Sequence, residues 1–342
     1  MTGALAAAPR RAEADRTPED RGIARDGVRL LVSRGDRDEP RRFLDLADAL
    51  APGDLLVVNE SATLPASLPA VAPGRSFWVN LSTQYDPRLW LVETRWAHDR
   101  PGPVPLALGE TFRVAGVRAR LVAEFPGSPR LAFLRSDADL RAAMVAQGRP
   151  IRYGYLAREY PLADYQTIFA RVPGSAEMPS AARPFTPRVL ARLAARGVGV
   201  APLVLHTGVS SLEGDPVTGR SAAVFPEPFD VPSATIESVR ATRARGGRVI
   251  AVGTTVVRAL ESAVDGCGLR AARGFTSLYL RAGRPLRAVD GLLSGFHGDR
   301  TTHLDLLETV VPPERLARAY ARARSSGFLW HEFGDSHLML PN

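Results

Sequence analysis

A block of short β-type segments interrupts a chain that otherwise alternates between strands and helices. Between residues 71 and 150 the apolar segments are short and partly alternating, with Pro and Gly between them: FWVNLS, LWLVETRW, TFRVAGVRARLVAEF and RLAFLR. This spacing is typical of a small barrel or sandwich. We therefore predict a small β-barrel domain over residues 71–150, inserted into a larger domain formed by residues 1–70 and 151–342.

The flanking segments predict an α/β large domain with a mixed sheet. Leu55–Val58 and Val249–Val252 are apolar runs that indicate buried strands. Thr186 and Gly197 bracket a helical pattern as its cap and its stop. The segment from Ser136 to Gly148 also predicts a helix, with Ser136 as its cap. Strands alternating with helices are typical of α/β architectures, and residues 1–16 are expected to be a disordered tail.

Two residue counts exclude several kinds of chemistry. The chain contains no lysine, which excludes a Schiff-base lysine, a pyridoxal phosphate anchor and a P-loop lysine. Cys267 is its only cysteine, which excludes an intrachain disulfide and a Cys-rich zinc site. We find no metal-binding motif, no signal peptide pattern and no apolar run long enough for a membrane span. We expect a cytoplasmic, metal-independent protein that is not bound to a membrane and is monomeric.

Positive charge is concentrated in the middle of the chain. Residues 100–200 contain 15 Arg against 7 Asp and Glu, whereas the rest of the chain carries 29 Arg and 29 acidic residues. A basic section suggests a polyanionic partner such as RNA, because neutralised phosphates contribute much of the affinity for nucleic acids. A solvated arginine-rich surface explains the same count equally well.

The segment GRVIAVGTTVVRALE combines a strand end with a helix start. Gly253 ends the apolar strand, and Thr254 and Thr255 open a helix that carries Arg258 and Glu261. Free backbone N–H groups at a helix start favour a carboxylate or phosphate, and glycine lets a ligand approach the backbone closely. Arg258 and Glu261 are spaced to pair on one helix face. The alternative is a capped core helix with a surface ion pair.

Four further residues are candidates for the same site. Asp290 and His297 flank the segment GLLSGF, and a histidine in such a loop suits acid–base chemistry. His206 follows an apolar strand, the usual place for site residues in open sheets. Asp335 precedes the last strand, where it either orients a ligand hydroxyl or makes a turn. For each of the two histidines, a structural role is an open alternative.

Taken together, nine segments resemble the S-adenosylmethionine:tRNA ribosyltransferase-isomerase family of queuosine biosynthesis. They are RDGVRLLV, PGDLLVVNES, DYQTIFA, GSAEMPS, PFT, VLHTG, VIAVGTTVVRALES, VDGLLSGFH and FGDSHLML, spread from about Pro18 to Leu340. Each segment is weak alone, but their joint order and spacing are specific. The resemblance implies a large α/β domain with an inserted small β-barrel, in agreement with the segment pattern above.

The resemblance also implies a reaction. The family moves the ribosyl group of S-adenosylmethionine onto a 7-aminomethyl-7-deazaguanine in tRNA, which gives epoxyqueuosine and releases adenine and methionine. S-adenosylmethionine would be a co-substrate, tRNA the partner, and no metal would be needed. We predict that catalysis depends on His297 and Asp290. The donor would be bound by the residues Gly253, Thr254, Thr255, Arg258, Glu261, Asn59, His206 and Asp335.

Several loops depart from the family pattern. Ala62 and Ser67 replace two arginines, Pro184 replaces a histidine, and Arg300 replaces a lysine. A histidine-rich stretch of the family is also absent. These changes leave two alternatives open: a paralogous S-adenosylmethionine-dependent enzyme that acts on a small-molecule acceptor, and a non-catalytic RNA-binding protein.

Overall fold

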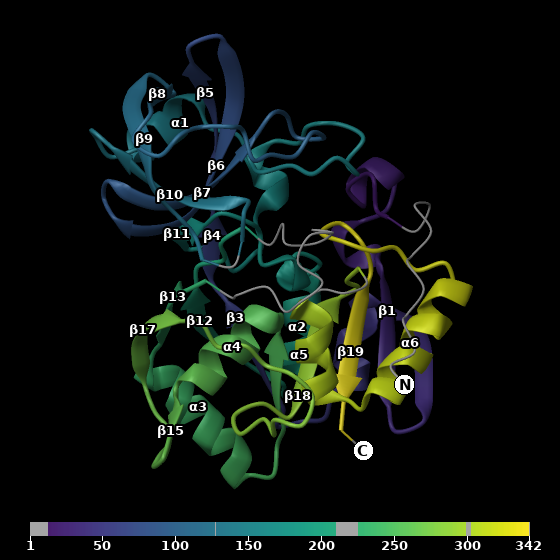
Figure 1. Ribbon diagram of the computed structural model, residues 1–342. Helices are drawn as coiled ribbons and strands as arrows, with labels where there is room; N and C mark the ends of the chain where they lie inside the picture. Colours follow the sequence, from purple (N-terminus) through teal and green to yellow (C-terminus); the bar gives the residue numbers. More distant parts are fainter. Residues whose placement is uncertain (1–12, 127, 210–224, 299–301, 342) are drawn as a thin grey trace.

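The computed structural model describes residues 13–126, 128–209, 225–298 and 302–341, and its larger part is built on one nine-stranded sheet (Figure 1). The strands lie in the order β17 (Ala272–Thr276), β13 (Glu227–Val231), β12 (Gly199–Leu205), β3 (Leu55–Asn59), β14 (Val249–Val252), β18 (Gly291–Gly295), β19 (Ser336–Leu340), β1 (Arg29–Arg34) and β2 (Arg37–Arg42). Strands β12, β3, β14 and β18 are mutually parallel, whereas β13 and β19 are antiparallel to their neighbours β12 and β18. The predicted mixed sheet is confirmed.

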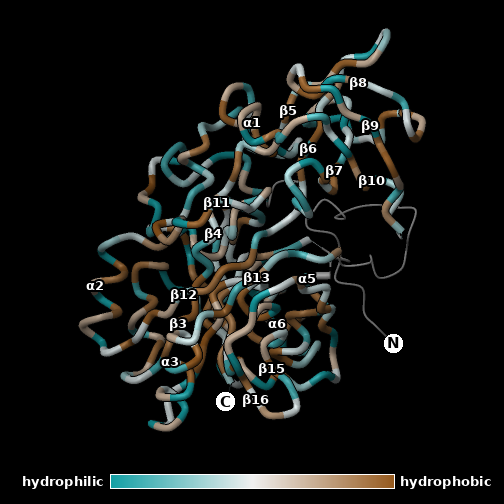
Figure 2. Tube along the Cα trace, turned by 90° about the vertical axis from the view of Figure 1, so that its left-hand side faces the viewer, coloured by the Kyte–Doolittle hydropathy of each residue, from teal (hydrophilic) through white to brown (hydrophobic). Residues whose placement is uncertain are grey.

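Helices cover both faces of this sheet, so its central strands are buried on both sides. One core contains apolar side chains of α3 (Ser233–Ala244), α4 (Thr254–Ser262), α5 (Thr302–Val310) and α6 (Pro313–Ser325). The other contains side chains of α2 (Pro187–Ala195) and of the 3-10 helix Phe43–Ala49. Strand β3 shows why: Leu55 and Val57 point into the first core, Leu56 and Val58 into the second. The sheet interior is correspondingly apolar (Figure 2).

The inserted block forms a closed antiparallel barrel, as predicted. Its strands lie in the order β10 (Leu131–Ser136), β7 (Leu89–Arg95), β6 (Arg75–Asp86), β5 (Ser67–Ala72), β8 (Thr111–Val114) and β9 (Val117–Glu124), and β9 pairs with β10 to close the ring. Helix α1 (Arg141–Gln147) follows β10. The first barrel strand begins at Ser67, before the predicted boundary at residue 71.

The two chain segments that connect the barrel with the large domain are hydrogen-bonded to each other. Ser67 and Arg149 exchange backbone hydrogen bonds, N to O in both directions at 2.9 Å. Next to this bridge, β4 (Ser61–Thr63) pairs in parallel with β11 (Val172–Ser175), and both lie between the barrel and the large sheet (Figure 1). The barrel therefore leaves and rejoins the large domain at one point.

Three expectations about local structure need correction or restriction. The helix expected from Ser136 begins at Arg141, because Ser136 is the last residue of β10 and its hydroxyl donates to the carbonyl of Ala138 instead of capping a helix. Of the expected disordered tail, residues 1–12 lie outside the described part. Ala14, by contrast, is fully buried, and its N–H donates to the carbonyl of Trp330, so the tail prediction is wrong there. In the part of the chain that the structure describes, no helix is long and apolar enough to cross a membrane.

A buried carboxylate fixes the amino-terminal edge of the sheet. Asp54, at the start of β3, accepts hydrogen bonds from the backbone N–H of Ala51 and from the backbone and guanidinium of Arg248. Burial opposes ionisation, but these donors outweigh it and lower the pKa of Asp54. A group with a lowered folded pKa contributes stability above its unfolded pKa, and that stability is lost as the pH falls through the folded pKa.

We therefore expect Asp54→Asn to lower the free energy of unfolding at pH 7 by about 2 kcal/mol, the scale of hydrogen bonds to a charged group. Urea denaturation measures this. The difference from wild type should shrink below about pH 4, the ordinary pKa of aspartate, where the unfolded chain takes up a proton that the folded carboxylate still resists. Asp48→Asn is the control, because Asp48 is half exposed and pairs with Arg192 at the surface, so its effect should stay within about 0.5 kcal/mol. Equal losses for the two variants would contradict this account.

Candidate active site

The carboxyl ends of four adjacent parallel strands bring five of the predicted site residues to one edge. Asn59 ends β3, His206 follows β12, Gly253 and Thr254 follow β14, and His297 lies just past β18. In open α/β sheets ligands bind outside this edge, so the placement agrees with the prediction for these residues. Thr255, on the first turn of α4, lies at the same edge.

Asn59 is fully buried and ties the strand ends together. Its Oδ1 accepts from the backbone N–H of Leu205 and of Ser61, both at 3.1 Å. Its Nδ2 donates to the carbonyl of Leu205 at 2.8 Å and to the hydroxyl of Thr255 at 3.3 Å. An amide has two donors and two acceptor lone pairs, and all four are used. Asn59 therefore positions the edge, and its predicted direct contact with the donor is not compatible with this network.

Gly253 turns the chain from β14 into α4. Its φ is +95°, a backbone conformation that residues other than glycine rarely adopt. The turn leaves the first N–H groups of the nine-residue helix α4 directed outward from the sheet edge. Thr254 is buried and Thr255 half-buried at this turn. This geometry suits an anionic or polar ligand group, as the sequence predicted.

His206 sits in a chain of hydroxyl groups. Its Nδ1 lies 2.8 Å from the hydroxyl of Ser61, which lies 2.6 Å from that of Ser175. Ser175 is linked in turn to Thr207 by its side chain and by the backbone N–H of Thr207. Gly174 lies flat against the imidazole, since a Cβ there would approach ring atoms to 2.3 Å. Only glycine at this position lets β11 cover the histidine.

Two histidines stack beside the start of α4. The rings of His297 and His303 lie 4.5 Å apart with an interplanar angle of 19°. His297 Nε2 is 3.0 Å from the hydroxyl of Ser294, and His303 Nδ1 is 3.4 Å from that of Thr254. His303 was not predicted as a site residue. Its spacing from His297 does not fit a metal-binding helix, and only folding of α5 onto α4 brings the two rings together.

Burial keeps all three histidines of this edge neutral at pH 7. Desolvation lowers the pKa of His303 to about 4, with a further contribution from Arg258. It also holds the pKa of His297 well below its usual value, assisted by His303 and His331. The pKa of His206 is lowered for the same reason, with Arg141 as the lesser cause. Each is therefore unprotonated and can accept a proton or a hydrogen bond at neutral pH, and the lowered pKa makes each a weaker base than a free histidine.

Arg258 and Glu261 do not form the predicted pair. Arg258 forms an ion pair with Glu227 and donates to the carbonyls of Thr276 and Leu278. Glu227 also accepts from the backbone N–H of Gly208 at 2.7 Å. Arg258 thus fixes the chain next to His206, at the predicted edge.

Glu261 has a different role from the predicted one. Its carboxylate is buried and accepts from the backbone N–H groups of Arg287 and Ala288, which precede β18. The helix α4 runs away from the site edge, so Glu261 lies near the opposite edge. The prediction that it binds the donor is therefore wrong.

Asp290 also lies at the opposite edge. It directly precedes β18, and its carboxylate accepts from the backbone N–H of Val249 at 2.8 Å and from Arg243. Strand β18 separates it from His297, and five extended residues span about 17 Å. The two residues therefore lie at opposite ends of one strand, and the structure does not bring them together as predicted.

Asp335 lies at the site edge but is occupied by backbone donors. Its two oxygens accept from the N–H groups of Arg29 and Leu329 at 2.7 and 2.8 Å. Desolvation raises the pKa of this carboxyl, and the two backbone donors and nearby arginines act against that shift. The residue joins the starts of β1 and β19, which explains its position in the sequence without a ligand.

A row of stacked rings was not predicted. Tyr153 and Tyr155 have ring centroids 6.3 Å apart, and Tyr155 stacks on His331 at 4.7 Å. Tyr153 donates to Glu177, and Tyr155 donates to Glu332 at 2.9 Å. No sequence spacing joins residues 153–155 to residue 331, so only the tertiary fold reveals this row.

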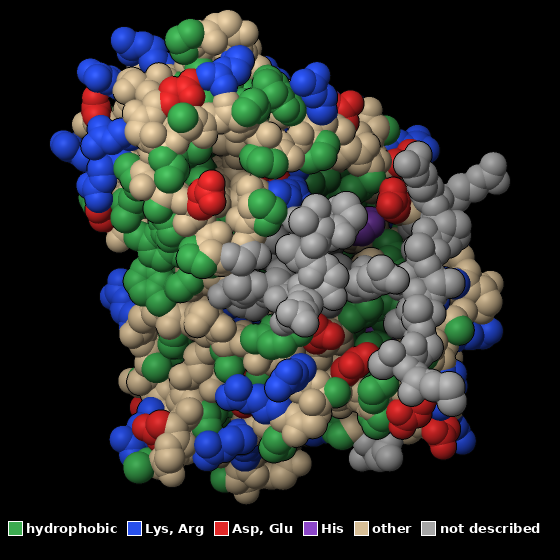
Figure 3. All heavy atoms as spheres, viewed as in Figure 1, with side chains coloured by type: hydrophobic (Ala, Val, Ile, Leu, Met, Phe, Trp, Pro, Cys, Tyr) green, Lys and Arg blue, Asp and Glu red, His purple; other side chains and the backbone are tan. Residues whose placement is uncertain are grey.

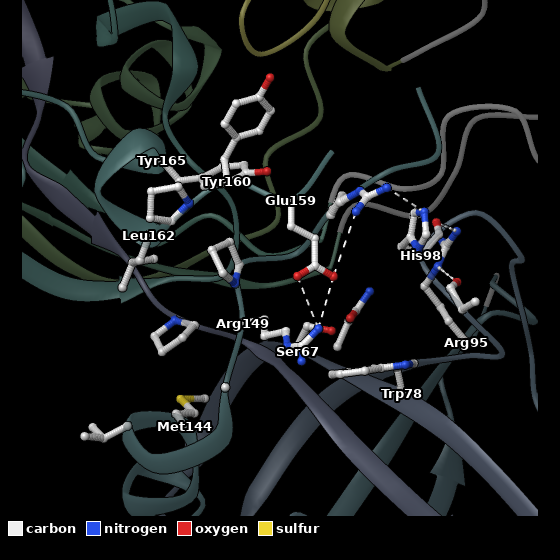
Figure 4. Close-up of a pocket in the computed structure, with 18 residues that line it drawn as sticks. Ser67, Trp78, Arg95, His98, Met144, Arg149, Glu159, Tyr160, Leu162 and Tyr165 are labelled. Carbon is white, nitrogen blue, oxygen red and sulfur yellow. Dashed lines mark hydrogen bonds and ion pairs between the residues drawn. The ribbon is translucent and has the colours of Figure 1, made fainter. Parts of the chain in front are cut away.

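A cavity of about 550 Å³ lies beside the barrel, away from the predicted residues. Its walls include Trp78, Arg149 and Glu159, which Figure 4 shows close to one another. None of the ten predicted site residues lines it. In the described ranges, no group of three His, Cys, Asp or Glu side chains is placed to hold a metal ion.

The lowered pKa of His303 gives a testable pH dependence. The unfolded chain gains a proton on this residue near pH 6.5, whereas the folded protein gains it only near pH 4. Stability should therefore fall with decreasing pH between these values, by about 1 kcal/mol per pH unit for this residue. We expect His303→Asn to remove that part of the slope in urea denaturation at a series of pH values. A variant with the wild-type slope would show that His303 is not desolvated.

Comparisons with known proteins agree with the fold. The family model described as "Queuosine biosynthesis protein" matches residues 8–339. The S-adenosylmethionine:tRNA ribosyltransferase-isomerase of Anaeromyxobacter sp. is 38% identical over 324 residues, which cover 92% of each chain. That of Thermus thermophilus is 37% identical over 327 residues, covering 92% of this chain and 93% of that protein.

A solved structure extends the similarity to the whole architecture. The crystal structure of S-adenosylmethionine tRNA ribosyltransferase from Thermotoga maritima superimposes with a TM-score of 0.55 at 25% identity, covering 97% of this chain and 98% of that one. A nine-stranded mixed sheet with an inserted closed barrel, a glycine turn at Gly253 and a match over almost the full length all point the same way. The chain belongs to the family of queuosine biosynthesis proteins.

Proposed function

We propose that this protein transfers the ribosyl group of S-adenosylmethionine to a 7-aminomethyl-7-deazaguanine in tRNA and isomerises it, releasing adenine and methionine. The relatives named above carry the name of this activity at 37–38% identity over 92% of the chain. The observation that carries the proposal is the meeting of His206, Gly253–Thr255 and His297 at the carboxyl ends of four parallel strands. We place the reaction in the cytoplasm.

The donor is expected at the start of α4. Backbone N–H groups of Thr254 and Thr255 face the edge, and Gly253 allows a ligand to approach the backbone. The methionine carboxylate or the ribose hydroxyls suit these donors. Asn59 and Arg258 then support the site indirectly, since they hold Thr255 and Glu227 in place.

The neutral histidines suit the first step. The sulfonium makes its neighbouring C–H acidic, and a base that takes this proton can start the rearrangement. His297 and His303 are neutral at pH 7, and one of them can take the proton. The hydroxyl group next to that ring, Ser294 for His297 or Thr254 for His303, and the stacked neutral ring are then its neighbours. The same group returns the proton when adenine departs and its nitrogen needs one. No metal is required for either transfer.

The reaction is tested with purified protein, S-adenosylmethionine and tRNA that carries the 7-aminomethyl-7-deazaguanine. Mass spectrometry should detect free adenine and a tRNA mass gain that needs both substrates. Unmodified tRNA and the free deazaguanine base are the two controls. Adenine release with the free base alone would favour a small-molecule acceptor, and tRNA binding without adenine release would favour a non-catalytic RNA-binding protein.

His297→Ala should lower kcat about 100-fold, the scale of a lost acid–base group. Asp290→Asn is the matched control, because Asp290 lies at the opposite edge and should change stability without lowering kcat in the folded enzyme. Rates under saturating substrate, with circular dichroism to confirm folding, measure both. An unchanged rate for His297→Ala would make His297 a structural residue, and a loss of rate in Asp290→Asn would contradict the separation of the two edges.

A further inference from the structure

The cavity of about 550 Å³ is within the range of ligand pockets, and Trp78, Tyr160 and Tyr165 are its aromatic lining residues. Phe77, Val79 and Leu81 of β6 fill the inside of the barrel, so the alternate residues Trp78 and Asn80 face outward. Both line the cavity. The ring of Trp78 is half-buried, and it is the only tryptophan among the lining residues.

The facing wall is basic. It is formed by the segment after α1, which contributes Arg149 and Arg152 against a single carboxylate, Glu159. The guanidinium of Arg149 lies 5.3 Å from the centroid of the Trp78 ring. Figure 4 shows Arg149 between Trp78 and Glu159. The face of Trp78 therefore already accepts a flat group inside the cavity.

The carboxylate partner of Arg149 is weakly held. The Arg149–Glu159 pair spans 3.1 Å, and both side chains are more than half exposed. Such surface pairs contribute about 0–1 kcal/mol. Arg152 is less exposed than Arg149, and its Nη2 lies 2.8 Å from His98 Nε2. Its buried Nε has no hydrogen-bond acceptor among the residues that the structure describes. An incoming anion would replace the exposed Glu159 carboxylate at Arg149 and supply an acceptor next to two guanidiniums.

An aromatic face beside guanidinium groups is the combination that binds unpaired nucleotides, because the base stacks and the phosphate is neutralised. We propose that this cavity holds one unstacked nucleotide of the RNA substrate, with its base on Trp78 and its phosphate between Arg149 and Arg152. The inference rests on the proposed function for the identity of the RNA as tRNA. An acidic peptide would use the arginines but leave Trp78 without a role.

The position of the cavity supports an RNA nucleotide next to the reacting one. Pro65 lines the cavity, and Ser61 contacts His206 at the sheet edge. Ser61 and Pro65 are four residues apart in the chain, so they lie at most about 14 Å from each other. One strand of RNA can therefore reach both the cavity and the sheet edge. Exposed arginines also lie on the barrel surface, at Arg88, Arg113, Arg118, Arg120 and Arg135, and Figure 3 shows basic side chains gathered on that part of the molecule. They provide the long-range attraction that RNA binding needs.

Trp78→Leu tests the proposal, because leucine keeps an apolar side chain and removes the stacking face. We expect it to raise the Kd for tRNA about 10-fold, within the range for loss of one stacked base. Trp78→Phe should keep most of the affinity. Arg149→Gln should weaken binding several-fold and reduce the dependence of Kd on salt. Filter binding at three salt concentrations measures all of these effects, and thermal melting confirms that each variant is folded.

The chain offers matched controls. Trp96 has Arg100 over its ring at 4.8 Å, but it does not line the cavity, so Trp96→Leu should leave the Kd unchanged. Arg273 is 84% exposed on β17, and Arg273→Gln removes the same charge as Arg149→Gln at a distant site. The Kd for S-adenosylmethionine, measured by calorimetry, should be unchanged in Trp78→Leu. Quenching of tryptophan fluorescence by tRNA should be smaller in Trp78→Leu than in Trp96→Leu.

The outcomes separate this proposal from the proposed function. If wild-type protein releases adenine but Trp78→Leu binds tRNA as tightly as Trp96→Leu, the cavity site is overturned and the enzyme activity stands. A loss of S-adenosylmethionine affinity in Trp78→Leu with unchanged tRNA affinity also overturns it, because the cavity would then hold the donor. Binding of a free 5′-mononucleotide that Trp78→Leu weakens, with no Trp78-dependent binding of tRNA, would overturn the proposal and identify a free nucleotide as the ligand. Trp78-dependent tRNA binding without adenine release supports the cavity site and counts against the enzyme activity.

Discussion

The four hydrogen bonds of Asn59 determine how the edge of the large sheet is arranged. This one amide joins the end of β3 to the end of β12, to the start of β4 and to the first turn of α4. The segment leading to the barrel begins immediately after it, so the direction in which the barrel leaves the sheet is set at the same place as the start of α4. A buried amide with all its partners present specifies one arrangement, because any shift of a strand leaves polar groups unpaired in the core.

Polar residues have different roles at the two edges of the sheet. At the amino-terminal edge Asp54, Asp290 and Glu261 are engaged by backbone N–H groups and arginines, and they hold strand starts. At the carboxyl-terminal edge the imidazoles of His206, His297 and His303 are contacted by hydroxyl groups rather than by carboxylates. Hydroxyl partners adapt to either tautomer of the ring, whereas a carboxylate would favour the charged form. The second edge is the one suited to moving a proton.

The sequence predicted the architecture more accurately than the site. Strand periodicity and the Pro and Gly positions of residues 71–150 were enough to predict the barrel. The alternation of strands and helices was enough to predict the mixed sheet. For the site, a strand end was a good guide: Gly253, His206 and His297 all follow strands and all lie at one edge. Asp290 precedes its strand, and the same rule would have placed it at the opposite edge. Glu261 and Asp335 look like ligand residues in sequence, but in the fold their carboxylates are engaged by backbone N–H groups. The ring row of Tyr153, Tyr155 and His331 has no local signal at all.

The paired backbone hydrogen bonds between Ser67 and Arg149 have a consequence for chain connectivity. Because the barrel begins and ends at this one bridge, the two points at which the chain leaves and re-enters the large domain lie side by side, whatever the length of the insertion. Loop-closure entropy grows slowly with length, so such a junction tolerates replacement of everything between its two sides by a brief linker. A linker across this junction would close the chain of the large domain, and the cost of removing the barrel would then lie in the exposure of Val209 and Phe225, which pack in the barrel core.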